Sequence, residues 1–226
     1  MLYLNEIDKP FIILSAAMTI DGKIASKDGD PDISDEADWK EVHKLRTEVD
    51  AILVGKGTII KDNPKLHIKY HDHDGYYRIV IDSNLLTPIE SNVIEFKPDL
   101  YPTIICTTEN VDNERVKLFE SKGIKILKSG EGSTVDVVNL LPKLYKIGIK
   151  SILLEGGGTL NWTFVKYNLV DEIRLTIAPW IVGGRNALSL VEGEGFSKMI
   201  SSTRYSLARL TERNNYVVIY YEKVKR

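Results

Sequence analysis

The sequence has little cysteine, little net charge and no long hydrophobic run. Its 226 residues include one cysteine, Cys106, which excludes an intramolecular disulfide framework and a cysteine-cluster metal site. We therefore expect a reducing, cytoplasmic setting. The 30 Lys and Arg residues nearly balance the 32 Asp and Glu residues, for a formal net charge of −2. This balance argues against nucleic acid or an anionic membrane as a partner of the whole chain.

No stretch approaches the roughly 18 consecutive apolar residues that a membrane span requires. The apolar stretch at 11–18 is interrupted by Ser15 and lacks a basic segment before it, so we expect no signal peptide. An apolar fraction of 43% and a charged fraction of 27% are typical of folded globular proteins. Because no low-complexity linker or internal repeat divides the chain, we predict a single domain over residues 1–226.

Short apolar runs alternate with helical patterns along most of the chain. The apolar runs predict buried strands at 11–14, 51–54, 78–82, 103–107, 124–127 and 151–154. Helical spacing predicts helices at about 35–49, 113–122, 135–147 and 159–168, with Pro142 expected to kink or delay the third. The alternation at 172–177 predicts a half-exposed strand, and the runs at 205–213 and 216–221 predict a hairpin around Asn214-Asn215. The pattern indicates an α/β fold with mostly parallel strands and antiparallel C-terminal strands.

Arg46 belongs to the first predicted helix, on a different face from Trp39 and Val42. A guanidinium suits a phosphate or carboxylate on a ligand. A solvated side chain near the helix C-terminus is the simpler interpretation, and the residues alone favour it.

Small, hydroxyl and acidic residues follow five of the predicted strands. Because open α/β sheets bind ligands beyond the carboxyl ends of their strands, this recurrence favours a nucleotide-type ligand. The segments are 18–23, 55–58 with Asp62, 82–84, 107–108 and 155–159.

The glycine-rich segment Glu155-Gly156-Gly157-Gly158-Thr159 is the sharpest of these signals. Three glycines between a strand and a helix let backbone N–H groups approach a phosphate, with the positive end of the helix dipole facing the anion. A tight strand-to-helix turn without a ligand is the alternative. The spacing is neither that of a Rossmann fingerprint nor that of a P-loop.

Three histidines, His67, His71 and His73, invite a metal-site hypothesis. A solvated loop is the better interpretation because no second ligand cluster exists, and we expect no metal. Cys106 is expected to be a core residue rather than a nucleophile. His43 is one possible base, although a histidine on a helix face is usually structural.

Taken together, seven segments in register resemble a known family. They resemble the stand-alone 2,5-diamino-6-ribosylamino-4(3H)-pyrimidinone 5′-phosphate reductases of archaea and fungi, which act in riboflavin biosynthesis and have a dihydrofolate-reductase-like fold. The matching segments are 18–25, 57–58 with 62–64, 79–83, 151–162, 170–172, 177–179 and 191–196.

The resemblance implies a fold with helices on both faces of the sheet and an NADPH-dependent reduction of a ribosylamino to a ribitylamino side chain. The zinc-deaminase signature of the bifunctional bacterial relatives is absent from the sequence, which favours the diaminopyrimidinone substrate. The alternatives are the deaminated uracil substrate, a pterin reductase of the same fold, and a nucleotide-binding sensor without chemistry. The resemblance also implies a homodimer.

The resemblance assigns roles to individual residues. Cofactor contacts are expected at Ala17, Thr58, Asp62, Ser83, Gly130, Gly156, Gly157, Gly158, Thr159 and Leu160. Substrate contacts are expected at Arg46, Leu66, Lys69 and Glu155.

Within the substrate set, Arg46 and Lys69 are expected to pair with the 5′-phosphate, and Glu155 to hold ribose hydroxyls and orient the reacting carbon. Lys69 stands where bacterial relatives tend to have Arg, which replaces a bidentate fork by a point charge. Asp21 and Lys23, with Glu155, are the catalytic candidates; either of the first two could deliver a proton, and a structural turn is the alternative for both.

Overall fold

The computed structural model describes residues 8–224. The chain forms two compact units. Among the described residues, unit 1 comprises 8–11, Val49–His67 and Asp74–Ile152, and unit 2 comprises Ile12–Glu48, Ile68–His73 and 153–224. Whether the two units behave as one domain stays a prediction.

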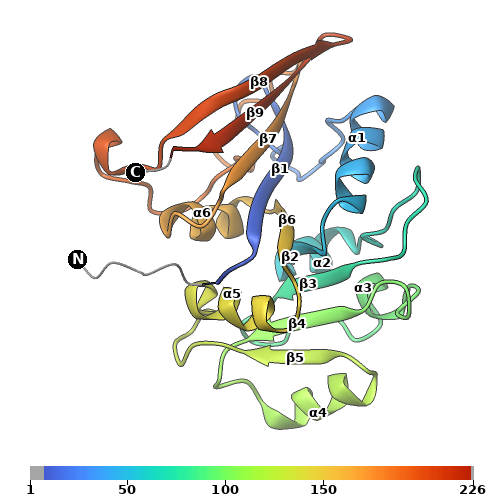
Figure 1. Cartoon of the computed structure of the whole chain (residues 1–226). Helices are drawn as coiled ribbons and strands as arrows, with labels where there is room; N and C mark the ends of the chain where they lie inside the picture. The colour runs from blue at the N-terminus through green and yellow to red at the C-terminus, as the bar shows by residue number, and fades with distance from the viewer. Residues whose placement is uncertain (1–7, 225–226) are drawn as a thin grey trace. The chain divides into compact units, whose positions relative to one another are not determined.

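Unit 1 contains four parallel strands in the order β5-β4-β3-β2, with helices between them in sequence (Figure 1). The strands are β2 (Ala51–Gly55), β3 (Tyr77–Ile81), β4 (Thr103–Thr107) and β5 (Lys125–Lys128). The helices are α2 (Lys56–Asp62), α3 (Asn92–Glu95), α4 (Asn113–Ser121) and α5 (Val137–Lys146).

Unit 2 contains the strand order β6-β1-β7-β9-β8, in which β1 and β7 are parallel and β9 is antiparallel to both its neighbours. Figure 1 shows β8 and β9 as a long red ribbon beside β7. The strands are β1 (Phe11–Thr19), β6 (Ser151–Gly156), β7 (Glu172–Ala178), β8 (Tyr205–Arg213) and β9 (Tyr216–Lys223). The helical segments are α1 (Glu36–Thr47), α6 (Gly158–Lys166) and the 3₁₀ turn η1 (Met199–Ser201).

The apolar runs of β2, β3, β4 and β6 form largely buried strands, as predicted, whereas Phe11 of β1 is 47% exposed and the residues of β5 are exposed or half-buried. Residues Ala51–Val54 of β2 are at most 1% exposed, and all of β4 is buried. Because both faces of such strands are covered, the sequence shows an unbroken apolar run rather than an alternation. The mostly parallel α/β architecture is therefore confirmed.

The C-terminal hairpin is also confirmed, and its turn explains the Asn-Asn pair. Asn214 and Asn215 have φ values of 48° and 69°. Two-residue hairpin turns of type I′ need positive φ at both positions, and Asn adopts this conformation more readily than most residues.

Helix α1 differs from its prediction in which face it buries. Trp39 is 43% exposed, whereas Asp38, His43 and Arg46 are 1%, 5% and 6% exposed. The interpretation of Arg46 as a solvated residue was therefore wrong. The helix buries a polar face because its side chains find partners on other parts of unit 2, described below.

Strand β7 was expected to be half-exposed and is largely buried. Its polar residues Arg174 and Thr176 are 2% and 0% exposed. Both donate hydrogen bonds to Oδ1 of Asp38, at 2.7 and 2.6 Å. The alternation of polar and apolar residues here reflects a buried polar cluster rather than a solvated face. In α5, the helix begins at Val137 and runs through Pro142 rather than starting late.

Candidate functional site

The glycine loop joins β6 to α6 in unit 2. Gly156 has φ of +89°, a conformation that side chains rarely adopt, and Gly157 precedes the first helical residue. No side chain caps this helix start, and a Cβ built at Gly157 has no heavy atom within 4 Å. Backbone N–H groups in the first turn of a helix lack intrahelical partners. The loop thus offers an open, uncapped helix N-terminus, the kind of site that binds anions.

Gly158 is required for a different reason, close packing. A Cβ at this position would lie 2.5 Å from the backbone oxygen of Ser189 and 2.9 Å from Cγ of Glu192. The Glu192 N–H also donates to the Gly158 carbonyl at 3.0 Å, and Ser189 N–H donates to Oε1 of Glu192 at 2.8 Å. The 187–192 segment is therefore packed directly against the first turn of α6.

Asn161 is a buried residue of this region that the sequence reasoning missed. It is 2% exposed, and its Nδ2 donates to the Leu190 carbonyl at 2.8 Å. A Cβ at Gly156 would lie 3.2 Å from this Nδ2. Asn161 thus forms a hydrogen bond with the 187–192 segment and packs against Gly156 of the glycine loop. A polar residue beside Leu160 on the buried face of a helical pattern was the available signal.

Arg46 and Glu155 form a buried, bidentate ion pair. Nε of Arg46 donates to Oε1 of Glu155 and Nη2 donates to Oε2, both at 2.8 Å. The two side chains are 8% and 14% exposed. The structure thus brings together two of the predicted substrate residues, one from the last turn of α1 and one from the end of β6. The Arg46 fork holds a protein carboxylate here.

A third predicted substrate residue, Lys69, is held beside α1 through its backbone. Its N–H donates to Nδ1 of His43 at 2.7 Å, so His43 serves as a structural acceptor. The ring of Tyr70 lies edge-on to His43, with centroids 5.0 Å apart. The side chain of Lys69 is exposed, and its ammonium lies 5.4 Å from the Tyr70 ring centroid.

Asp21 and Lys23 are both engaged by loop backbone. Asp21 accepts hydrogen bonds from the N–H groups of Val182 and Gly183 and from the Thr19 hydroxyl. These bonds, that of Thr19 first, lower the pKa of Asp21 to about 2.

Nζ of Lys23 donates to the Ala187 carbonyl at 3.0 Å and to Oγ of Ser189 at 2.9 Å. These contacts favour the structural alternative for both Asp21 and Lys23, in which they hold the segments that follow β7.

A buried cluster around Asp38 supports this part of unit 2 and was not anticipated. Burial raises the pKa of Asp38, but the Arg174 charge and hydrogen bonds from Thr176, Arg174 and Ser34 outweigh burial, so the pKa lies below its usual value. Because Asp38 lies on the same helix as His43 and Arg46, the cluster fixes α1 against β7.

Unit 1 carries four of the predicted cofactor residues and the predicted substrate residue Leu66. Thr58 and Asp62 lie on α2; the side chain of Thr58 is half-buried and that of Asp62 is exposed. Ser83 and Gly130 follow β3 and β5: Oγ of Ser83 accepts from the Val135 N–H at 3.2 Å, and Gly130 has φ of +93°.

The positions of two further predicted residues, Leu66 and Ala17, are given by their backbone contacts. Leu66 is buried, and its carbonyl accepts from the Tyr76 hydroxyl at 2.7 Å. In unit 2, Ala17 is half-buried in β1 and opposite Thr176 of β7.

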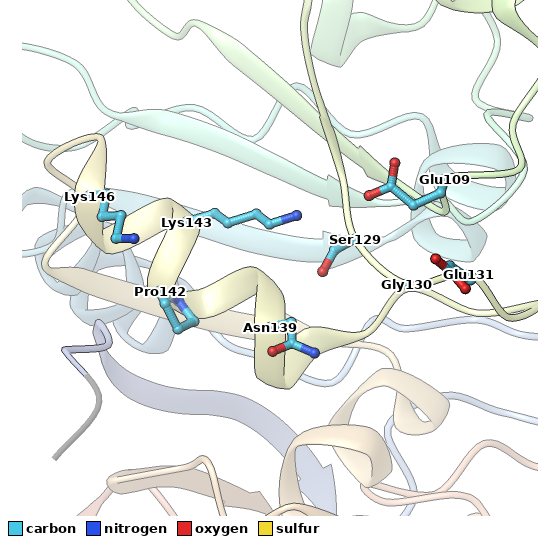
Figure 2. A pocket seen from close by; sticks show the side chains of 8 residues that line it. All are labelled: Glu109, Ser129, Gly130, Glu131, Asn139, Pro142, Lys143 and Lys146. Atoms are coloured by element: carbon cyan, nitrogen blue, oxygen red, sulfur yellow. The ribbon is translucent and has the colours of Figure 1, made fainter. Parts of the chain in front are cut away.

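A cavity of about 610 Å³ opens in unit 1 beside Gly130. Figure 2 shows Lys143 extending from α5 toward Ser129, and its Nζ donates to the Lys128 carbonyl at 2.6 Å. The lining mixes acidic and basic side chains and comprises Glu109, Ser129, Gly130, Glu131, Asn139, Pro142, Lys143 and Lys146. Gly130 is therefore accessible from a recess, as a cofactor contact must be.

Residues 8–224 contain neither a candidate membrane span nor a candidate metal site. No helix in this range combines the length and apolar character needed to cross a membrane. Within the same range, no group of three or more His, Cys, Asp or Glu side chains is arranged to hold a metal ion.

Comparison with known proteins identifies the family. The family model described as the RibD C-terminal domain matches residues 10–219. The chain is 42% identical over 204 residues to the 2,5-diamino-6-ribosylamino-4(3H)-pyrimidinone 5′-phosphate reductase of Methanothermobacter thermautotrophicus, covering 89% of this chain and 92% of the relative. It is 37% identical over 224 residues to the Aquifex aeolicus protein of the same name, covering 97% and 99%.

Solved structures agree on the fold. A pyrimidine reductase-like protein from Corynebacterium diphtheriae superimposes with a TM-score of 0.81 at 20% identity, covering 100% of this chain and 96% of that one. A bifunctional deaminase and reductase from Thermotoga maritima gives 0.78 at 24% identity, covering 96% of this chain but 57% of that protein. The fold is dihydrofolate-reductase-like. The chain belongs to the RibD C-terminal domain family, the reductase family of riboflavin biosynthesis, and is an oxidoreductase.

Proposed function

We propose that this protein reduces the ribosylamino side chain of 2,5-diamino-6-ribosylamino-4(3H)-pyrimidinone 5′-phosphate to the ribitylamino form, with NADPH as reductant. The proposal rests on the end of β6. There the carboxylate of Glu155 is held by Arg46, and the uncapped N-terminus of α6 follows within three residues. Identities of 42% and 37% to reductases named for this substrate support it.

The residues around the glycine loop suit a pyrophosphate. Open space beside Gly157 leaves room for an anion, and the unpaired N–H groups at the start of α6 donate to it. We assign this role to the loop residues Gly156, Gly157, Gly158, Thr159 and Leu160. Ala17, Thr58, Asp62, Ser83 and Gly130 are proposed as further cofactor contacts. When bound, NADPH supplies a hydride from its nicotinamide ring.

The substrate side of the proposal uses Arg46, Leu66, Lys69 and Glu155. Lys69 presents an exposed ammonium to the 5′-phosphate. Glu155, held by Arg46, accepts hydrogen bonds from ribose hydroxyls and thereby orients the carbon that receives hydride. Catalysis then rests on positioning rather than on a strong acid–base pair. A proton-transfer role for Asp21 or Lys23 stays a prediction, against which the backbone contacts of both side chains count.

We also propose a homodimer in a reducing, cytoplasmic compartment. Strand β8 stands at the end of the strand order of unit 2, so one of its edges has no neighbouring strand in that order. Leu207 and Leu210 on this strand are each 57% exposed. A second copy would cover both features. Light scattering after gel filtration tests this, and Leu210→Glu is expected to shift a dimer toward monomer.

The function is tested by following NADPH absorbance with purified protein. The proposal predicts loss of absorbance that depends on the diaminopyrimidinone phosphate, with slower or no turnover of the deaminated uracil substrate and of dihydrofolate. Preference for dihydrofolate would identify a pterin reductase instead. Tight NADPH binding without turnover of any of the three would indicate a nucleotide sensor.

A further inference from the structure

The backbone of Leu66 has an unusual conformation for its residue type. Its φ is +42°, in the left-handed region that residues other than glycine seldom occupy, and the residue is 5% exposed. Leu66 lies in the segment that follows α2, in which Asn63 also has positive φ, of 40°. A strained conformation of this kind persists only where the surrounding contacts fix it, and such conformations cluster at ligand sites.

Both peptide groups that flank Leu66 are held by side chains at the start of β3. Nη1 of Arg78 donates to the Lys65 carbonyl at 3.1 Å, and the Tyr76 hydroxyl donates to the Leu66 carbonyl at 2.7 Å. These two carbonyls belong to the peptide groups on either side of the Leu66 Cα. The two hydrogen bonds therefore fix the orientations that the φ and ψ angles of Leu66 determine.

Arg78 can hold this segment in place because it is itself fixed. It is fully buried, and its guanidinium also donates to the carbonyls of Asn92, at 3.3 Å, and of Tyr101. Burial lowers the pKa of Arg78 to about 10, so the side chain stays charged at neutral pH. A buried charge persists only where hydrogen bonds compensate it, and hydrogen bonds from a charged donor are stronger than neutral ones. The three carbonyls are therefore held firmly around one rigid, planar group.

The start of the segment is tied to the same cluster through Asn92. Its N–H donates to Oδ1 of Asn63 at 2.8 Å, and its Nδ2 donates to the Asn63 carbonyl at 2.6 Å. The segment 63–66 is thus fixed at one end by Asn92 and at the other by Arg78 and Tyr76, all within unit 1.

We propose that Arg78 and Tyr76 are positioning residues that act through Leu66, holding its backbone in the left-handed conformation in which it contacts the substrate. The proposal rests on the proposed function, in which Leu66 is a substrate contact. It makes this part of the substrate site preformed. A purely structural role for the two residues would affect the stability of the protein and leave substrate binding unchanged.

Tyr76→Phe tests the proposal in the reductase assay because it removes one hydroxyl and keeps the ring. Misplacing a contact that holds substrate and transition state equally raises KM and leaves kcat nearly unchanged. Substrate KM is expected to rise roughly two- to tenfold, the factor that corresponds to one net hydrogen bond. Arg78→Lys should raise it further, because an ammonium does not reproduce the planar set of donors.

Thr103→Val is the matched control. The Thr103 hydroxyl is also buried in unit 1 and donates to a backbone carbonyl, that of Val93, but it does not contact the 63–66 segment. This variant should lower the melting temperature and leave substrate KM unchanged. An unchanged KM in Tyr76→Phe, or an equal rise in Thr103→Val, would overturn the proposal.

Cleavage by trypsin after Lys65 tests the backbone contacts without turnover and separates them from the proposed function. The Lys65 side chain is exposed, so the bond that follows it resists the protease only while the backbone is held. Mass spectrometry should show cleavage at this bond about two- to tenfold faster in Tyr76→Phe than in the wild type, and unchanged in Thr103→Val. Equal rates in Tyr76→Phe and the wild type would overturn the proposal. If cleavage changes as expected but the wild type reduces no pyrimidine phosphate, the proposed function fails while the fixing of Leu66 by Tyr76 stands.

Discussion

Substitution by alanine should lower the stability of the protein at one glycine of the loop after β6 and leave it nearly unchanged at the adjacent glycine. A Cβ at Gly158 would approach the Ser189 carbonyl oxygen to 2.5 Å, which real Cβ atoms do not do, whereas a Cβ at Gly157 meets nothing within 4 Å. Gly158→Ala must therefore push the 187–192 segment away from α6 or strain the helix start. Gly157→Ala requires no movement and serves as the matched control.

The expected size follows from overpacking, which costs about 1–3 kcal/mol. Alanine's better helix propensity returns about 1 kcal/mol, so Gly158→Ala should lose up to about 2 kcal/mol. For a chain of this length, that loss corresponds to a fall in melting temperature of up to about 8 °C. Thermal unfolding followed by circular dichroism measures it. A melting temperature for Gly158→Ala equal to or above that of Gly157→Ala would refute the packing argument.

Four further outcomes are expected. Gly157→Val should fold normally but bind NADPH weakly, because its side chain enters the open space beside the loop; unchanged affinity in a fluorescence titration would remove the loop from the cofactor site. Asp38→Asn should cost about 3–5 kcal/mol in urea unfolding because Arg174 is left buried without its partner, whereas Glu114→Gln, at an exposed pair, should cost under about 0.5 kcal/mol; equal costs would contradict the buried-pair reasoning. The pKa of Asp21 is lowered to about 2, so its contribution is present above its ordinary value of 3.8 and is lost as pH falls toward 2; amide exchange at Gly183 should be protected at pH 5 and unprotected in Asp21→Ala, and equal protection would exclude the contact. Burial raises the pKa of the Cys106 thiol, so it should resist thiol reagents until the protein unfolds, and rapid native-state labelling would contradict its place in β4.

The fold was predictable where a single physical effect, such as burial or local backbone conformation, decides the structure. Apolar runs such as that of β4 predicted strands because a strand that is buried on both faces must be apolar along its whole length. The Asn214-Asn215 pair predicted its turn because local backbone conformation decides it.

The prediction failed where polar groups are buried in pairs. The exposure expected for Arg46 and for the polar face of β7 was wrong because Glu155 and Asp38, far away in sequence, supply their partners. A single residue's polarity carries no information about such a partner. Departures of this kind concentrate at functional sites, where local preference gives way to a required arrangement.

The candidate site was predictable in part from glycine and strand-end patterns. These patterns located the loop after Glu155 but could not distinguish the open space at Gly157 from the tight packing at Gly158. Asn161 was missed because one amide on a helical apolar face has no distinctive spacing.

The most direct test of the account is a comparison of NADPH oxidation by the wild-type protein with the diaminopyrimidinone phosphate and with dihydrofolate under identical conditions. The account predicts substrate-dependent loss of NADPH absorbance with the pyrimidine phosphate and little with dihydrofolate. Folded protein that binds NADPH but reduces no pyrimidine phosphate at any pH would contradict it.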